Sequence, residues 1–317
     1  MNRQGIRPVI LFGCLLTGAV VFLLSTAVFG APVTVSPVGK EAFQDYWYPN
    51  GAEISRFALK QSRYGEIHEG DAVLVFVTEP VNPQLQVKAD RPAPENVPVL
   101  KLNSTRKFYT GVYPYSVMTS VFAPVDVRTF PLPLKISFSA QEWCGHVYGQ
   151  MNLREGRYDI QEHSYFEAEA DRQYAVPGAV SEDALWTLIR IAPESLPVGT
   201  LKMIPGMLHS RFAHTPMAVR EVVATLDAAD RASAEGRELA AYTVRYPESG
   251  RMLTIFFERE FPFRIDGWRD ASRAAPHFGG KELTTEARRT HILMLDYWNR
   301  HTNADRRFLQ NLGLGVE

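Results

Sequence analysis

Residues 238–260 read ELAAYTVRYPESGRMLTIFFERE, and this stretch decides the fold class. Two runs rich in β-branched and aromatic residues flank Pro247-Glu248-Ser249-Gly250, which is typical turn material. Such runs predict strands, and the short turn between them predicts an antiparallel hairpin. The stretch therefore indicates a sheet made from strands that are neighbours in the chain, without crossover helices.

The same pattern recurs along most of the chain. A second hairpin is predicted at 147–170, with Glu155-Gly156 at its turn, and the strand patterns follow one another at intervals of roughly 8–15 residues. We therefore predict a mainly β fold: a large antiparallel sheet or open barrel, in one piece or as two sheet halves, with one or two flanking helices. Further strand patterns occur at 52–61, 71–79, 115–124, 134–143, 220–227 and 261–271.

Helical patterns are few. Residues 181–193 begin with a serine suited to an N-cap and place apolar residues on one face, and residues 303–314 predict a short closing helix. Residues 284–301 suit a strand or a helix, and we favour a strand. The proline-rich stretch 78–101 is expected to be a long surface loop or lid, and 191–210 to connect two β-rich halves.

The N-terminus predicts export. Arg3 and Arg7 precede 23 residues, Val9–Ala31, that carry no charge. A short basic stretch before an apolar run is typical of a secretory signal, whereas a run of this length also suits an uncleaved membrane anchor. Lipidation at Cys14 is a third alternative.

These boundaries give the expected organisation of the chain. We expect residues 1–30 to be a signal peptide or N-terminal membrane anchor. Residues 31–190 and 191–317 would form two β-rich halves packed as one continuous unit. The expected location is the periplasm or cell envelope, with membrane attachment only through the N-terminal segment.

Composition and motifs narrow the classes of function. The chain has 317 residues, of which 45% are hydrophobic and 22% charged, and its formal net charge is −1. No run concentrates positive charge, which argues against nucleic-acid binding. The sequence has none of the spacings HxH, HExxH or CxxC of metal sites, and no GxSxG nucleophile elbow. We expect no metal and no cofactor.

Residues 139–148, SAQEWCGHVY, gather reactive side chains. In an extended strand Glu142, Cys144 and His146 would share one face, at the mouth of a barrel or cleft, unless Gly145 introduces a bulge. A neighbouring imidazolium lowers the pKa of a thiol and favours the nucleophilic thiolate. These three residues, with His163, are the candidate catalytic groups, whereas a buried structural cysteine is the simpler interpretation.

Aromatic residues are concentrated at 108–122. On a curved sheet, Tyr113 and Tyr115, together with Ile136 and Phe138 of the following strand pattern, would line an apolar pocket for a lipid, a glycan or a peptide. Core packing is the alternative, because aromatic residues are favoured in strands generally.

Several longer stretches resemble an uncharacterised family of exported bacterial proteins: residues 45–80, 110–122 (TGVYPYSVMTSVF), 141–148 (QEWCGHVY), 164–171 (SYFEAEAD) and 202–206 (KMIPG). Some members are labelled septum formation inhibitor Maf. Maf nucleotide pyrophosphatases carry an N-terminal SxSPRR-type phosphate loop, and this sequence has none. The resemblance therefore implies no activity and no catalytic residues. At the level of fold, the late strand pattern is similar to the open barrels of LolA/LolB-like periplasmic proteins, which implies a curved sheet around an apolar cavity.

Together these features favour a non-enzymatic envelope protein. We expect it to bind an apolar or amphiphilic ligand such as a lipid, or an envelope protein partner, in the concavity of a curved sheet. The alternative is a hydrolase that uses Cys144 or the neighbourhood of Glu142, His146 and His163.

Overall fold

The structure is a computed structural model that describes residues 33–315. The predicted signal or anchor at residues 1–30, with Cys14, lies outside the described residues. Between residues 33 and 315, no helix has both the length and the apolar character needed to cross a bilayer.

One sheet dominates the described part of the chain, and it contains sixteen strands. Neighbouring strands pair antiparallel, except for the short parallel pair β10 and β11. The strands are β1 (Ala52–Arg63), β2 (Glu66–Asn82), β3 (Val87–Lys88), β4 (Val97–Thr110), β5 (Tyr113–Pro124), β6 (Lys135–Glu142), β7 (Gly145–Arg154), β8 (Arg157–His163), β9 (Arg172–Pro177), β10 (Val180–Ser181), β11 (Gly199–Ile204), β12 (Arg220–Ala228), β13 (Leu239–Tyr246), β14 (Arg251–Glu258), β15 (Ile265–Arg273) and β16 (Glu282–Leu295).

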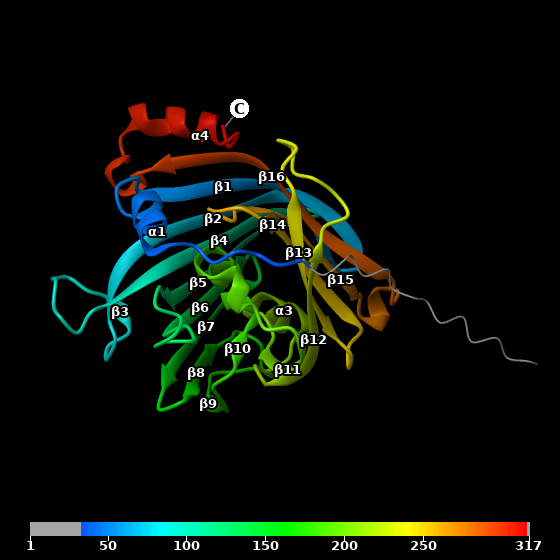
Figure 1. Cartoon of the computed structure of the whole chain (residues 1–317). Coiled ribbons are helices and arrows are strands. Elements are labelled where there is room, and N and C mark those ends of the chain that lie inside the picture. Colours follow the sequence, from blue (N-terminus) through cyan, green and yellow to red (C-terminus); the bar gives the residue numbers. More distant parts are fainter. Residues whose placement is uncertain (1–32, 316–317) are drawn as a thin grey trace, which may run out of the picture.

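The order of the strands explains the shape of the sheet. The order runs β10-β11-β12-β13-β14-β15-β16-β1-β2-β4-β5-β6-β7-β8-β9, and β3 pairs with β2. Strand β16 therefore pairs with β1, with Leu295 opposite Ala52. The two ends of the order, β9 and β10, are separated in the chain only by residues 178 and 179. The sheet remains open but curls around α3 (Figure 1), which confirms the predicted mainly β, antiparallel, open architecture.

The concave face of the sheet forms the main core. Alternate residues of each strand point to this face, and α2 (Glu182–Ile191) packs on it against β4 and β5. Leu185 and Ile189 of α2 are fully buried. The helix predicted at 181–193 is thus confirmed, with Ser181 at the N-cap position.

A buried ion pair joins α2 to the first strand of the sheet. The guanidinium of Arg190 binds both carboxylate oxygens of Glu53 on β1, with 2.7 Å between Nη2 and Oε2. It also lies 4.9 Å from the ring centroid of Trp47 in α1 (Lys40–Trp47). Both charged side chains are almost completely buried, so each compensates the desolvation of the other.

Four α-helices occur in the described residues, where the sequence predicted one or two. The unpredicted ones are α1 and α3 (Met207–Ala213). Both span about two turns, too short for a clear helical period. The closing helix predicted at 303–314 is α4 (Arg307–Asn311), preceded by a 3₁₀ turn. The 3₁₀ turns are Pro193–Ser195, Pro276–Phe278, Tyr297–Asn299 and Asn303–Arg306.

The C-terminal segment covers part of the convex face. Leu312, just after α4, is buried against Ala52 and Ile54 of β1 and Val77 of β2. Figure 1 shows α4 lying over β16 and β1 on the outside of the curve. This small second core protects the region where the first and last long strands meet.

Half of the proline-rich stretch 78–101 is strand, so the predicted surface loop is confined to residues 83–96, where only β3 is strand. Strand β2 continues to Asn82, β4 begins at Val97, and Pro80 lies opposite Pro98 in the ladder. Val81 and Val99 are fully buried. Prolines usually mark strand edges or loops, but here the burial of the neighbouring valines outweighs the missing backbone donors.

Candidate functional site

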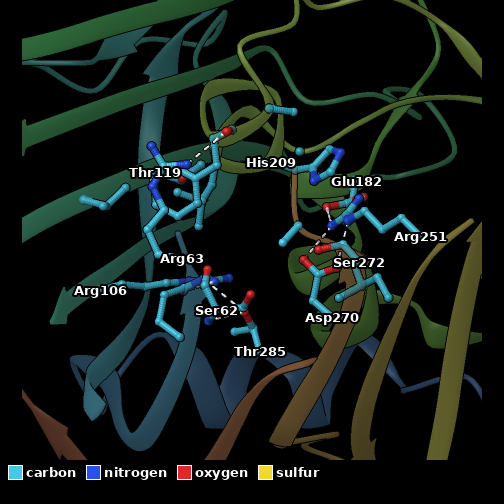
Figure 2. A pocket seen from close by; sticks show the side chains of 18 of the residues that line it. Ser62, Arg63, Arg106, Thr119, Glu182, His209, Arg251, Asp270, Ser272 and Thr285 are labelled. Atoms are coloured by element: carbon cyan, nitrogen blue, oxygen red, sulfur yellow. Dashed lines mark hydrogen bonds and ion pairs between the residues drawn. The ribbon is translucent and has the colours of Figure 1, made fainter. Parts of the chain in front are cut away.

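A cavity of about 710 Å³ lies inside the curl of the sheet. Figure 2 shows it surrounded by side chains from strands of both ends of the chain and from the helical segment between them. Its apolar lining includes Leu102, Val117, Val121, Trp186, Leu208, Leu253 and Trp268. Its polar lining includes Arg63, Ser104, Arg106, Thr119, Glu182, Asp183, His209, Arg251, Asp270, Ser272 and Thr285.

One wall of the cavity carries a network of buried charges. Arg251 of β14 donates from Nη2 to Oε1 of Glu182 at 2.8 Å, and from Nε to Oδ1 of Asp270 at 2.7 Å. Burial alone would raise the pKa of Asp270, but the charge and hydrogen bonds of Arg251 outweigh it and lower that pKa. Tyr246 also donates to Glu182. The two carboxylates therefore share one guanidinium, which favours the ionised form of Asp270.

Asp183, next to Glu182 in α2, has a different environment. Its Oδ2 accepts a hydrogen bond of 2.9 Å from the backbone N–H of Met207, at the start of α3. No basic side chain of residues 33–315 forms an ion pair with it. Burial raises its pKa to about 7, and the nearby charge of Glu182 adds to that effect. The close approach of α3 requires Gly206, because a Cβ there would lie 2.6 Å from Oε1 of Glu182.

Two arginines lie on the strands across from this network. Arg106 of β4 donates from Nη1 to Oε1 of Gln61 at 3.0 Å and stacks 5.2 Å from the ring centroid of Trp268. Arg63 of β1 donates to the carbonyl oxygen of Phe212 at 3.0 Å. Figure 2 shows both arginines on one side of the cavity, and Arg251 with its carboxylates on the other. The cavity thus has a charge-compensated wall and an arginine wall.

His209 of α3 adds a titratable group to the cavity. Burial is the main cause that lowers its pKa, and the charge of Arg251 acts in the same direction. A neutral imidazole here offers one donor and one acceptor without adding charge to the site.

The cavity reaches the surface at one end. Tyr64 and Gly65, in the turn between β1 and β2, and His277 and Phe278, in the loop between β15 and β16, line this end. Phe278 is partly exposed, and its ring centroid is 5.1 Å from that of Tyr64. These two loops therefore border a mouth through which a ligand can enter.

The predicted ligand-binding residues lie beside this cavity and do not line it. Ile136 and Phe138 are buried on the concave face, and Tyr115 stacks on Phe108 with 4.9 Å between ring centroids. The hydroxyl of Tyr115 is 2.6 Å from that of Tyr64, which does line the cavity. Tyr113 is half-buried and packs against the same core.

The predicted catalytic residues are separated by a turn. Strand β6 ends at Glu142 and β7 begins at Gly145, so Trp143 and Cys144 form a two-residue hairpin loop. Cys144 is exposed and does not continue the face of β6, which corrects the expectation that it shares a face with Glu142. This turn was not recognisable from the sequence, because neither Trp143 nor Cys144 is a usual turn former.

The histidines of that region point away from Glu142. His146 lies opposite Gln141, and His163 opposite Tyr148, so both imidazoles project from the convex face. Glu142 projects from the concave face, where its carboxylate lies 3.5 Å from the guanidinium of Arg211. His163 instead lies 3.3 Å from Asp171. The geometry does not bring Cys144, a histidine and a carboxylate together.

The charged cavity residues were not predicted from the sequence. A signal exists for one of them: Arg251 occupies a concave-face position of β14, and the other residues on that face before Glu258 are the apolar Leu253, Ile255 and Phe257. A charge at such a position is rarely buried without a partner or a function.

Two further observations concern possible metal ligands and similarity to known proteins. No group of three or more His, Cys, Asp or Glu side chains suited to a metal ion occurs within residues 33–315. Comparisons of the chain with known protein families, with curated proteins and with solved structures found no match.

Proposed function

We propose that this protein is exported to the cell envelope and binds an amphiphilic ligand, without chemical conversion, in the cavity inside its curled sheet. The observation that carries the proposal is the cavity of about 710 Å³, with apolar and polar walls and an open mouth. This volume lies in the usual range for small-molecule sites, which are mostly apolar with a few convergent polar groups.

The composition of the lining supports a ligand with two kinds of surface. Leucine, valine and tryptophan side chains line the cavity together with hydroxyl groups and arginines. An apolar ligand alone would leave the arginines without partners, whereas a small polar ligand would leave the apolar wall in contact with water. An amphiphile satisfies both parts.

A test is to fill the cavity and measure binding of N-phenyl-1-naphthylamine, an uncharged apolar fluorophore. Val117 lines the cavity from β5, so Val117→Trp is expected to reduce binding at least tenfold. Burial of one methylene contributes about 0.8 kcal/mol, so the loss of two such contacts exceeds the ~1.4 kcal/mol of a tenfold change. The matched control is Met118→Trp, because Met118 is the next residue of β5 and is exposed on the convex face. Thermal unfolding of both variants shows whether they remain folded.

Two results would contradict the proposal. One is that wild-type protein does not bind the fluorophore and carries no small molecule in native mass spectrometry after purification from the envelope. The other is that folded Val117→Trp binds as tightly as Met118→Trp, which would place the bound probe outside the cavity.

A further inference from the structure

Arg106 is a half-buried cation inside the curl of the sheet, and it lacks an anionic partner. Its single hydrogen bond to the described residues is the one to Gln61, and no carboxylate of residues 33–315 lies within the 4.0 Å of an ion pair. Gln61 is itself held by a 3.0 Å bond to Thr285 Oγ1. The other N–H groups of the guanidinium remain available to the cavity that Arg106 lines.

Burial has a clear electrostatic effect at this position. It lowers the pKa of Arg106 to about 10, and the more distant charge of Asp270 only partly offsets this. The guanidinium nevertheless remains protonated at neutral pH. A buried charge without a partner is costly, and an anion placed against it removes much of that cost.

The carboxylates across the cavity do not serve as that anion. Glu182 and Asp270 are both bound by Arg251, and Asp183 has a pKa raised to about 7, so it is partly protonated at neutral pH. Arg63 increases the excess of positive charge. It too has no carboxylate within 4.0 Å among the described residues, and its Nε is buried without a hydrogen-bond partner.

We infer that Arg106, assisted by Arg63, binds an anionic group of the ligand: a carboxylate, a sulfate or a phosphate. The planar guanidinium offers paired N–H donors that match the oxygens of such groups. Thr285 Oγ1 already accepts bonds from Gln61 and from the backbone N–H of Ser62, so its own proton is free to be donated. The apolar wall then holds the rest of the molecule. This inference rests on the proposed function and adds the chemical class of the ligand.

The experiment compares ligands that share a ten-carbon chain and differ in the head group. Decanoate, decyl phosphate, decanol and decyltrimethylammonium are titrated, each below its micelle concentration, by displacement of N-phenyl-1-naphthylamine. Inorganic phosphate is titrated by calorimetry. We expect the two anions to bind wild-type protein about 10- to 100-fold more tightly than decanol, because charge-assisted hydrogen bonds add this much. We expect the cationic ligand to bind more weakly than decanol.

Variants then assign that preference to Arg106. Arg106→Gln is expected to lose the preference for anions, so that it binds decanoate no more tightly than it binds decanol. Arg106→Lys is expected to keep part of the preference, because an ammonium retains the charge without the paired donors. The matched control is Lys107→Gln, which removes one positive charge from the next residue of β4, on the exposed face.

The outcomes separate this inference from the proposed function. Equal affinities of wild type for decanoate and decanol, or an unchanged anion preference in folded Arg106→Gln, would refute the anion site while leaving the cavity proposal intact. If neither the fluorophore nor any ligand binds, both proposals fail. If inorganic phosphate binds as tightly as decyl phosphate, the site binds a free anion, and the proposal of an amphiphilic ligand is refuted.

Discussion

Asp183 shows how burial changes the chemistry of a single side chain. It shares the start of α2 with Glu182, yet Glu182 is bound by Arg251 and Tyr246, whereas Asp183 receives only the Met207 backbone N–H. Burial raises the pKa of Asp183 to about 7, although the hydrogen bond from Met207 acts against this. The two carboxylates are adjacent in the chain, but their hydrogen-bond partners are different.

The raised pKa predicts a particular dependence of stability on pH. The folded state binds the proton of Asp183 more tightly than the unfolded state does, so the stability that Asp183 contributes is fully present below about pH 3.8 and is lost as the pH rises to about 7. The full effect corresponds to about 4 kcal/mol. Asp183→Asn keeps an acceptor for Met207 and is expected to remove this loss, so its stability relative to wild type grows between pH 4 and 7.

Chemical denaturation of both proteins across that range measures the difference. The variant must be compared with wild type because His209 changes stability with pH in the direction opposite to Asp183. Burial lowers the pKa of His209, so its contribution to stability is lost as the pH falls below about 6.5. Asp270, with its lowered pKa, acts only below about pH 3.8. A stability difference between variant and wild type that stays constant from pH 4 to 7 would show that Asp183 does not titrate there.

The hairpin of β6 and β7 sets the reactivity of Cys144 at the scale of the element. Its two-residue loop exposes the thiol and separates it from the cavity and from the imidazole of His146. We therefore expect Cys144 in the folded protein to react with an aromatic disulfide reagent within a factor of about three of the rate for an unfolded chain. We expect Cys144→Ser and His146→Ala to leave binding of N-phenyl-1-naphthylamine unchanged. Strong protection of the thiol, or lost binding in either variant, would contradict this geometry.

Elements were predictable from the sequence where their pattern is local. The hairpin with β13 and β14 has alternating apolar residues and a turn of Pro, Ser and Gly, and the structure contains it as predicted. Strand β16 was ambiguous, and the structure resolves it as a strand. The cavity depends instead on pairing across long distances. Arg106 stacks on Trp268, and Arg251 binds Glu182, only after the sheet has curled. No local sequence pattern specifies such long-range contacts.

Long-range packing also explains why the predicted ligand-binding residue Tyr115 lies outside the cavity lining. Tyr115 is on the concave face, as an alternating strand requires, but Phe212 of α3 packs edge-on to it at 6.0 Å. Because α3 was not recognisable in the sequence, the part of the concave face that it covers was not recognisable either. The open part of that face lies farther along β5, at Val117, Thr119 and Val121.

At the scale of the whole molecule, the two parts of the chain are held together across the sheet. Residues 33–177 contribute β1 to β9, residues 180–315 contribute β10 to β16, and nine residue pairs connect β1 to β16. The buried pair of Glu53 and Arg190 crosses the same division. The peptide link at residues 178–179 is therefore one of several connections between the parts.

This arrangement predicts that the protein tolerates a break at that link. Fragments 33–178 and 179–315, produced together, are expected to co-purify in equal amounts and to bind N-phenyl-1-naphthylamine. A second fragment that ends at residue 281 lacks β16 and is expected to lose most of this association, since it cannot form the ladder with β1. Separation of the complete fragments on a sizing column would show that the covalent link is essential.

The pairing of β1 with β16 also determines when the molecule can fold. The first long strand to leave the ribosome has as its neighbour the last long strand to be made, so one edge of β1 has no partner until residue 295 has been synthesised. Contacts of such wide sequence separation close slowly. The sheet therefore stays incomplete through nearly all of the synthesis of residues 52–295, and during that time the unpaired edge of β1 is exposed to aggregation.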